Sequence, residues 1–309
     1  MRLRVAGGEA DVREPFLGGS RPRPREHRLR DVDADAAEKI TNSPEHRAIA
    51  LKAAQRTIVL LKNDKNTLPL DLNKLKTIAV IGPNADGLHL GGYSRDPVHG
   101  VSILQGIQDR VGSKAKVVFA EGCRFTNKSQ DWHGWFDDNV ELIDPATQAD
   151  KIKEAVDLAK KSDVAILVVG ENESTNREAW SEQHRGDRDS LDLLGAQNEL
   201  VKQVVETGTP TVVFLINGRP LSINYIAEKV PSIIEGWYLG QEGGTAAANV
   251  LFGDVNPGGK LPITFPHSVG DLPDFYNHKP SANRSYAFST REPLFPFGFG
   301  LSYTTFEYS

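Results

Sequence analysis

Six short apolar runs, separated by stretches with helical spacing, organise most of this chain. The runs are rich in Val, Ile and Leu, and most of them end at Gly, Asn or another turn-forming residue. They predict strands over residues 77–81, 116–119, 164–169, 211–216, 232–237 and 261–265. Pro262 restricts the last run to an edge of the sheet, where it can run antiparallel.

Between and before these runs, apolar residues recur at helical spacing. We expect helices over residues 44–62, 101–111, 149–160, 196–206, 221–228 and 242–251. The first follows Ser43, a capping residue, and has Pro44 at its first helical position. Strands that alternate with helices of this length predict an α/β fold. We expect a three-layer sandwich in which a mostly parallel six-stranded sheet carries helices on both faces.

The first 30 residues differ in composition from the rest of the chain. They contain eight arginines and no lysine, with Gly and Pro among them. A basic arm for an anionic surface, a disordered tail, and sequence left by a truncated reading frame are three interpretations. The sharp change near residues 31–35 favours the last two. We divide the chain into an Arg-rich disordered tail (1–32), a connecting helix and linker (33–76), the sandwich (77–266) and an aromatic C-terminal extension (267–309).

Composition and charge narrow the classes of partner. The 309 residues are 39% hydrophobic and 25% charged, as in a soluble globular protein, and the net charge is −5. This charge argues against nucleic acid as the main partner. No apolar stretch approaches the ~20 residues that cross a bilayer, so we expect no membrane partner either. The single cysteine, Cys123, excludes an intramolecular disulfide and a multi-cysteine metal site.

Sequence motifs for common cofactors are absent. The histidines His184, His267 and His278 lack the short spacing of a zinc site, and GPNAD at residues 82–86 lacks the glycine spacing of phosphate-binding loops. No G-x-S-x-G elbow occurs. We therefore predict no metal and no cofactor. Glu242 is either a second catalytic carboxylate or, as we favour, a glutamate whose charge suits a helix N-terminus.

The polar loop over residues 171–189 is the strongest candidate for chemistry. It reads ENESTNREAWSEQHRGDRD, and nine of its 19 residues are charged. The run before it, VAILVV, is apolar throughout, which is typical of a parallel strand covered on both faces. Ligands of open α/β sheets bind beyond the carboxyl ends of such strands. A carboxyl group in this loop, near Trp180 and flanked by arginines, is a candidate proton donor.

Several long motifs occur in an order that resembles a known family. They are SPEHRAIALKAAQRTIVLLKND, KTIAVIGPNADGLHLGGYS, DRDSLDLLGAQNELV, EGGTAAANVLFGDVNPGGKLPITFP and PLFPFGFGLSYTTFEYS. Together they resemble the C-terminal sandwich domain of family 3 glycoside hydrolases over roughly residues 33–309. That family includes β-glucosidases and β-xylosidases, which pair an N-terminal (β/α)8-like barrel with an (α/β)6 sandwich. The resemblance implies a six-stranded sheet here.

The resemblance also implies a role for one glutamate of the polar loop. In this family the nucleophilic aspartate lies on the barrel. The general acid/base is often a glutamate on a sandwich loop that reaches over the active site. The segment NREAW places that glutamate best at Glu178, and Glu171, Glu173 and Glu182 are its rivals.

Four further residues of the loop are expected to bind substrate. Trp180 could form the apolar wall that raises the pKa of the acid, or stack on the sugar of the leaving group. Arg177 and Arg188 would orient carboxylates or sugar hydroxyls, and His184 lies between them in the sequence. For each arginine the alternative is a surface salt bridge.

We do not expect the barrel in this chain, because too few residues precede residue 33. The predicted function is the sandwich portion of a retaining, exo-acting β-glycosidase that hydrolyses β-linked glucosides or xylosides when a barrel is supplied in trans. Whether the chain alone is an enzyme stays open. The alternative is a stand-alone, non-catalytic domain that binds carbohydrate or protein, or a chain that self-associates. The aromatic tail that motivates this alternative contains Phe295, Phe297, Phe299, Tyr303 and Phe306.

Compartment and sugar preference are not determined by these residues. Members of the family are often periplasmic or secreted, and this chain starts without the apolar segment of a signal peptide. The residues that choose between glucose and xylose are expected to lie largely on the barrel.

Overall fold

The computed structural model describes residues 33–94, 97, 99–279, 287, 289–305 and 307, and the backbone of two short strands near the N-terminus. The chain divides into two compact units, Met1–Ser43 and Pro44–Ser309. The first unit holds the antiparallel strands β1 (Leu3–Val5) and β2 (Gly8–Ala10) and helix α1 (Ala34–Ile40). Apart from those strands, the predicted tail lies outside the described residues. The predicted domain boundaries remain predictions.

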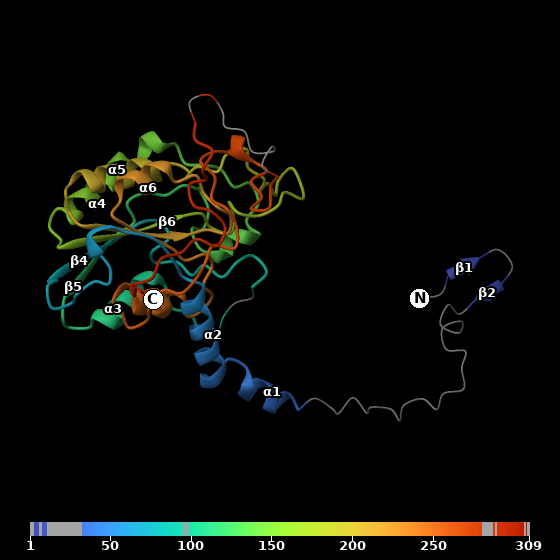
Figure 1. Cartoon of the computed structure of the whole chain (residues 1–309). Coiled ribbons are helices and arrows are strands. Elements are labelled where there is room, and N and C mark those ends of the chain that lie inside the picture. The colour runs from blue at the N-terminus through green and yellow to red at the C-terminus, as the bar shows by residue number, and fades with distance from the viewer. Residues whose placement is uncertain are drawn as a thin grey trace. The chain divides into compact units, whose positions relative to one another are not determined.

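Six strands form the sheet of the second unit (Figure 1). They are β3 (Val59–Asn63), β4 (Thr77–Ile81), β5 (Lys116–Ala120), β6 (Val164–Gly170), β7 (Thr211–Ile216) and β8 (Ser232–Glu235). Their order is β3-β8-β7-β6-β4-β5, and all neighbours are parallel except β3 with β8. The mostly parallel six-stranded α/β fold is confirmed.

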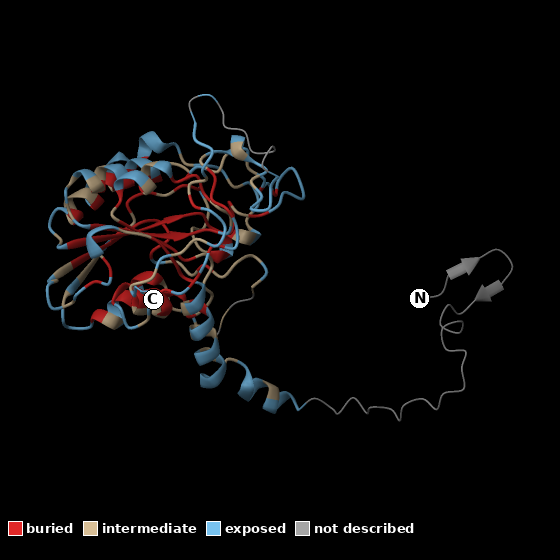
Figure 2. Cartoon of the chain, viewed as in Figure 1, coloured by how far each residue is buried: buried red, intermediate tan, exposed pale blue. Residues whose placement is uncertain are grey.

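Helices cover both faces of the sheet, and the buried residues lie between the layers (Figure 2). On one face pack α4 (Ala149–Ala159), α5 (Gln197–Glu206) and α6 (Asn224–Lys229); on the other pack α2 (Pro44–Thr57), α3 (Ile103–Val111) and α7 (Gly243–Leu251). Short 3₁₀ turns are η1 (Asp64–Asn66), η2 (Trp132–Phe136), η3 (Pro145–Gln148) and η4 (Val269–Asp271). Helices α3, α4 and α5 each bury one apolar stripe, whereas most positions of α7 are buried and α2 buries only Ala54.

The sixth strand is not the one that the sequence predicts. Helix α2 ends at Thr57, and the apolar residues that follow form β3 instead of the last turns of a helix over 44–62. Thr57, Ile58 and Val59 are β-branched, which lowers helix propensity and favours an extended backbone. Because Ile58 and Leu61 also satisfy helical spacing, spacing alone assigned them wrongly.

Residues 261–265, the predicted edge strand, do not form a strand. Phe265 makes one isolated antiparallel bridge with Phe295, and the N–H of Leu261 donates to the carbonyl oxygen of Phe299. Pro262 has no N–H to donate, so the ladder cannot continue through this segment. The sheet has an antiparallel edge, but β3 provides it.

Much of the aromatic C-terminal extension is covered by the unit's own core. Phe295 is only 8% exposed and packs against Phe265, with ring centroids 6.2 Å apart. Phe299 joins the same cluster, and the Tyr303 hydroxyl donates to the carbonyl oxygen of Val250 at 2.9 Å. The expectation of an uncovered tail is therefore wrong for Phe295.

A smaller part of this extension does face solvent. Phe297 is exposed and stacks on the exposed ring of Tyr276, with centroids 4.5 Å apart. Phe306 lies outside the described residues. Self-association through this extension stays a prediction, with a smaller aromatic surface than the sequence implies.

Candidate active site

The carboxyl ends of the parallel strands bring the candidate side chains to one edge of the sheet. The order of strands along the chain reverses between β4 and β6, which are neighbours, and open sheets bind ligands at such switch points. Asn84, which follows β4, donates through Nδ2 to the carbonyl oxygen of Glu171 at 2.9 Å. Glu171 is the first residue after β6, so the polar loop begins at the centre of this edge.

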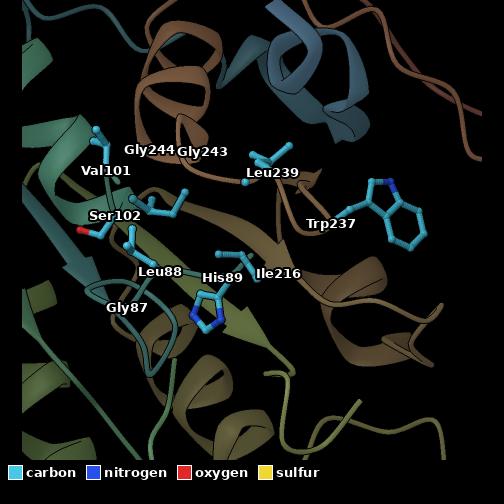
Figure 3. Close-up of a pocket in the computed structure, with 12 residues that line it drawn as sticks. Gly87, Leu88, His89, Val101, Ser102, Ile216, Trp237, Leu239, Gly243 and Gly244 are labelled. Atoms are coloured by element: carbon cyan, nitrogen blue, oxygen red, sulfur yellow. The ribbon is translucent and has the colours of Figure 1, made fainter. Parts of the chain in front are cut away.

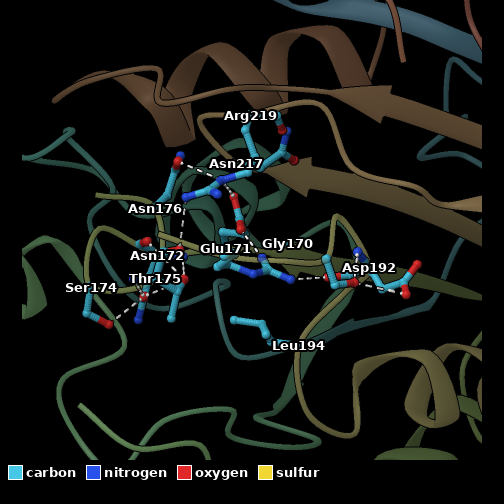
Figure 4. Close-up of polar contacts among 12 residues, drawn as sticks. Gly170, Glu171, Asn172, Ser174, Thr175, Asn176, Asp192, Leu194, Asn217 and Arg219 are labelled. Atoms are coloured by element: carbon cyan, nitrogen blue, oxygen red, sulfur yellow. Dashed lines mark hydrogen bonds and ion pairs between the residues drawn. The ribbon is translucent and has the colours of Figure 1, made fainter. Parts of the chain in front are cut away.

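Glu171 is buried and pairs with Arg188 and Arg219, the second of which is labelled in Figure 4. Its Oε1 accepts from Nη1 of Arg188, and its Oε2 lies 3.4 Å from Nε of Arg219, within ion-pair distance but outside hydrogen-bond geometry. Burial raises the pKa of Glu171, and the positive charges of Arg219 and Arg188 act against that rise. Arg188 thus pairs with a carboxylate of its own chain, and its expected part in binding substrate stays a prediction.

A second buried carboxyl group, Glu235, lies at the end of β8. Its Oε1 accepts from the N–H of Trp237 at 2.7 Å, and its Oε2 accepts from Nδ2 of Asn217 at 3.1 Å. Burial raises the pKa of Glu235 to about 8 even though both hydrogen bonds lower it, and the negative charge of Glu171 adds to the rise. At neutral pH this carboxyl group is therefore mainly protonated.

Glu173 is buried as well and fixes a neighbouring turn. Its Oε1 accepts from the backbone N–H groups of Leu90 and Gly91, at 2.8 and 3.0 Å, and its Oε2 lies 3.2 Å from Nδ1 of His89. After burial, its negative charge is the next cause that raises the pKa of Tyr238. Glu171 and Glu173, the two buried rivals of Glu178 for the proton-donating role, are thus covered by other residues of this chain.

Glu178 faces solvent between two anchored neighbours. Its side chain is exposed and makes no hydrogen bond or ion pair with any residue that the structure describes. On one side Arg177 is buried, and on the other the N–H of Ala179 donates to Oδ1 of Asp187 at 3.2 Å. The backbone around Glu178 is therefore held while its carboxylate is open to a ligand.

Arg177 ties this loop to η2 through main-chain oxygens. Its Nε donates to the carbonyl oxygen of Arg185 at 3.0 Å. Its Nη1 donates to the carbonyl oxygens of Gly134 at 3.2 Å and Trp135 at 2.6 Å, and its Nη2 to that of Asp137 at 2.7 Å. Burial lowers the pKa of the guanidinium, and two nearby aspartates oppose that change. We propose that Arg177 anchors the loop instead of meeting the substrate.

Replacing Arg177 by lysine is expected to lower the free energy of unfolding by roughly 2–4 kcal/mol, because an ammonium group has three N–H donors and lacks the fork with which the guanidinium reaches four carbonyl oxygens. Urea unfolding measures the loss. Arg185→Lys is the matched control, since the guanidinium of Arg185 is exposed and its Nε donates to the carbonyl oxygen of Glu182. Equal effects of the two substitutions would contradict the anchoring role.

A row of aromatic rings borders the polar loop. Trp180 is 61% exposed and stacks on His184, with ring centroids 3.3 Å apart and an interplanar angle of 18°. Trp135 lies 6.0 Å from Trp180, and the exposed ring of Tyr93 lies 5.2 Å from Trp135. Gly92 makes room for this row, since a Cβ there would lie 1.8 Å from the Trp135 ring.

A small cavity lies beside the switch point (Figure 3). Its volume of about 20 Å³ suits about one water molecule, which is far too little for a sugar ring. His89, Ser102, Ile216 and Gly243 are among the residues that line it. This cavity can therefore hold a water molecule but not a sugar.

Two classes of site find no support in the described part of the chain. Within it, no three His, Cys, Asp or Glu side chains lie together in a way that could hold a metal ion. None of the helices found there combines the length and the apolar character needed to cross a membrane.

The sequence pointed to the loop's own charges but missed the residues that surround them. Asn84, Asn217 and Arg219 follow strands, and Glu235 ends one. Each packs against the start of the polar loop or against another member of this set. Their position just after an apolar run was the available signal, since such positions share one edge of a parallel sheet.

The sequence matches a known family along most of its length. Residues 58–303 match the glycosyl hydrolase family 3 C-terminal domain. The chain belongs to glycoside hydrolase family 3. A β-xylosidase from Formosa agariphila is 47% identical to this family 3 chain over 289 residues, which cover 90% of the chain and 36% of that enzyme. A periplasmic β-glucosidase from Salmonella typhimurium is 40% identical over 294 residues, which cover 90% of this chain and 37% of that enzyme.

The fold of this family 3 chain also matches a solved structure. A β-glucosidase from Erythrobacter marinus aligns with a TM-score of 0.83 at 44% identity, over 88% of this chain and 37% of that one. The family and the fold predicted from the motifs are thereby confirmed. The chain spans little more than a third of the length of these relatives.

Proposed function

We propose that this chain supplies the general acid/base of a retaining β-glycosidase, and that Glu178 is that residue. The substrates would be β-linked glucosides or xylosides, the classes named for the relatives. The observation that carries the proposal is the exposed Glu178 carboxylate on a backbone pinned at both sides. A group that transfers a proton has to be held in place yet reach the reacting oxygen.

The surroundings of Glu178 suit a leaving group that is itself a sugar. Trp180 and Tyr93 present exposed rings beside the polar loop, and aromatic faces offer flat apolar surface to sugar rings. Apolar surroundings raise the pKa of a carboxyl group and so keep it protonated for use as a general acid. Glu178 would gain that setting when a second domain covers this edge of the sheet.

In this proposal the nucleophile belongs to a barrel domain, which lies outside the C-terminal domain that this chain matches. A retaining enzyme needs two carboxyl groups about 5 Å apart, one to attack the anomeric carbon and one to protonate the leaving oxygen. The family resemblance assigns the attacking group to the barrel. Arg188 then supports the site indirectly, by holding Glu171 at the root of the loop.

A hybrid enzyme tests the proposal. This chain replaces the matched part of the Erythrobacter marinus β-glucosidase, and hydrolysis of 4-nitrophenyl β-glucoside and β-xyloside is measured. We expect the hybrid to be active, and both the remainder of that enzyme and the isolated chain to be inactive. Robust hydrolysis by the isolated chain that disappears in Glu178→Ala would contradict the division of the site between two parts.

A stand-alone binding domain is the second candidate. The exposed rings of Tyr93, Phe136 and Trp180 favour it, because aromatic surface of this kind marks sites of binding. Calorimetry of the isolated chain with glucose, xylose and cello-oligosaccharides separates the candidates. Tight sugar binding together with an inactive hybrid would favour this alternative.

A further inference from the structure

His184 lies beneath Trp180, buried within the polar loop. Its side chain is only 4% exposed, and its Nδ1 lies 2.8 Å from Oδ1 of Asp138, whose side chain is 60% exposed. The Nε2 atom is buried and has no hydrogen-bond partner among the described residues. A histidine enclosed in this way does not meet a sugar directly, although the sequence suggests that it binds substrate.

The two residues form a closed structural unit. Their rings stack nearly parallel, 3.3 Å apart between centroids. The backbone N–H of Trp180 donates to the carbonyl oxygen of His184 at 3.2 Å, and the backbone N–H of His184 donates to Oγ of Ser181 at 2.9 Å. Because ring contact and main-chain bonds link the same residues, the position of the imidazole determines that of the indole.

Asp138, the partner of His184, belongs to a segment that is fixed from other directions. The N–H of Asn139 donates to the carbonyl oxygen of Gln183 at 2.8 Å, and Arg177 donates to the carbonyl oxygen of Asp137. The bond between His184 and Asp138 therefore connects the underside of Trp180 to an anchored part of the unit.

We infer that His184 is a positioning residue that, braced by Asp138, sets the plane of the Trp180 indole for stacking on the leaving-group sugar. The identity of the ligand, a β-linked sugar, rests on the proposed function, whereas the ring geometry does not. His184 covers one indole face and leaves the other open. An indole already fixed in this way loses little side-chain freedom when a sugar binds.

The test follows Trp180 in the full chain by fluorescence. The chain has four tryptophans, so the Trp180 signal is taken as the difference between each variant and the same variant with Trp180→Phe. Acrylamide quenching then reports how many indole faces are open. His133→Ala is the matched control, because His133 makes a comparable ring contact with Trp132, 4.3 Å between centroids, and also pairs with an aspartate.

In His184→Ala the second indole face opens, so the quenching constant of Trp180 is expected to rise about twofold. Asp138→Ala, at an exposed position that tolerates truncation, is expected to raise it in the same direction. His184→Phe restores a stacked ring and should return the constant toward that of the unchanged chain. His133→Ala should leave it unchanged. Circular dichroism confirms that each variant is folded.

Cellobiose, added to the same samples, tests the role of the fixed indole in binding. We expect cellobiose to protect Trp180 from acrylamide, with an affinity about 3–10-fold weaker in His184→Ala, the range for losing one aromatic contact. If cellobiose fails to protect Trp180 in the unchanged chain, the proposed function loses support while the quenching result still decides the positioning. Equal quenching of Trp180 in the unchanged chain, His184→Ala and Asp138→Ala would overturn the inference.

Discussion

Replacing Glu178 by glutamine is expected to lower kcat about 10²–10⁴-fold for phenyl β-glucoside in the hybrid enzyme. Glutamine preserves the shape of the side chain but has no proton to give to the leaving oxygen and cannot activate water afterwards. Because Glu178 makes no hydrogen bond or ion pair with a described residue, the substitution should leave the fold and the stability unchanged. The loss would therefore be one of chemistry.

Glu182→Gln is the matched control for this prediction. Glu182 is an exposed glutamate on the same loop, so the substitution removes the same charge four residues away. We expect kcat to stay within about threefold of the unchanged hybrid, which is the scale of a weak surface charge effect. A large loss in Glu182→Gln with none in Glu178→Gln would move the acid/base role to Glu182.

Replacing Glu235 by glutamine is expected to remove part of the pH dependence of the free energy of unfolding. The pKa of Glu235 is about 8 in the folded chain against an ordinary value of 4.5. The folded state therefore binds the proton more tightly, and the stability contributed by the neutral carboxyl group is fully present below pH 4.5 and is lost as the pH rises to about 8. The loss is roughly 5 kcal/mol, from about 1.4 kcal/mol for each pKa unit. Glutamine stays neutral, so it avoids this loss.

Urea unfolding at pH 5 and pH 9 measures the effect. At pH 5 the variant and the parent should be nearly equal in stability, whereas at pH 9 the variant should be more stable by several kcal/mol. Glu206→Gln, at an exposed helix position, corrects for the change in net charge. A difference that does not change with pH would contradict the raised pKa.

The fold was predictable where one signal dominated. The central strands, such as residues 164–169 and 211–216, are almost entirely apolar and bounded by turns, and both predictions are confirmed. The edge was not predictable, because residues 58–61 satisfy helical spacing and residues 261–265 read as apolar. The burial of Val59 and Leu61 in the assembled sheet makes residues 59–63 the edge strand. The missing N–H of Pro262 keeps residues 261–265 from forming a ladder.

The candidate site was predictable in its location but not in its internal contacts. The loop after residue 170 is marked by its charges, yet the sequence does not tell which of them are enclosed. Arg177 was expected to orient carboxylates or sugar hydroxyls, and its bonds to main-chain carbonyls could not be read from the sequence. Glu235 was predicted only as part of a strand. Its raised pKa follows from burial and is opposed by Asn217, a residue 18 positions away, so it could not be predicted from the sequence.

The dependence of the Glu178→Gln hybrid on its leaving group tests most directly whether Glu178 delivers the proton. 2,4-Dinitrophenyl β-glucoside has a leaving group that departs without protonation, whereas phenyl β-glucoside needs an acid. We predict that Glu178→Gln lowers kcat/KM less than about tenfold for the first substrate and by about 10²–10⁴-fold for the second. Equal losses for both substrates would contradict the assignment of Glu178 as the acid.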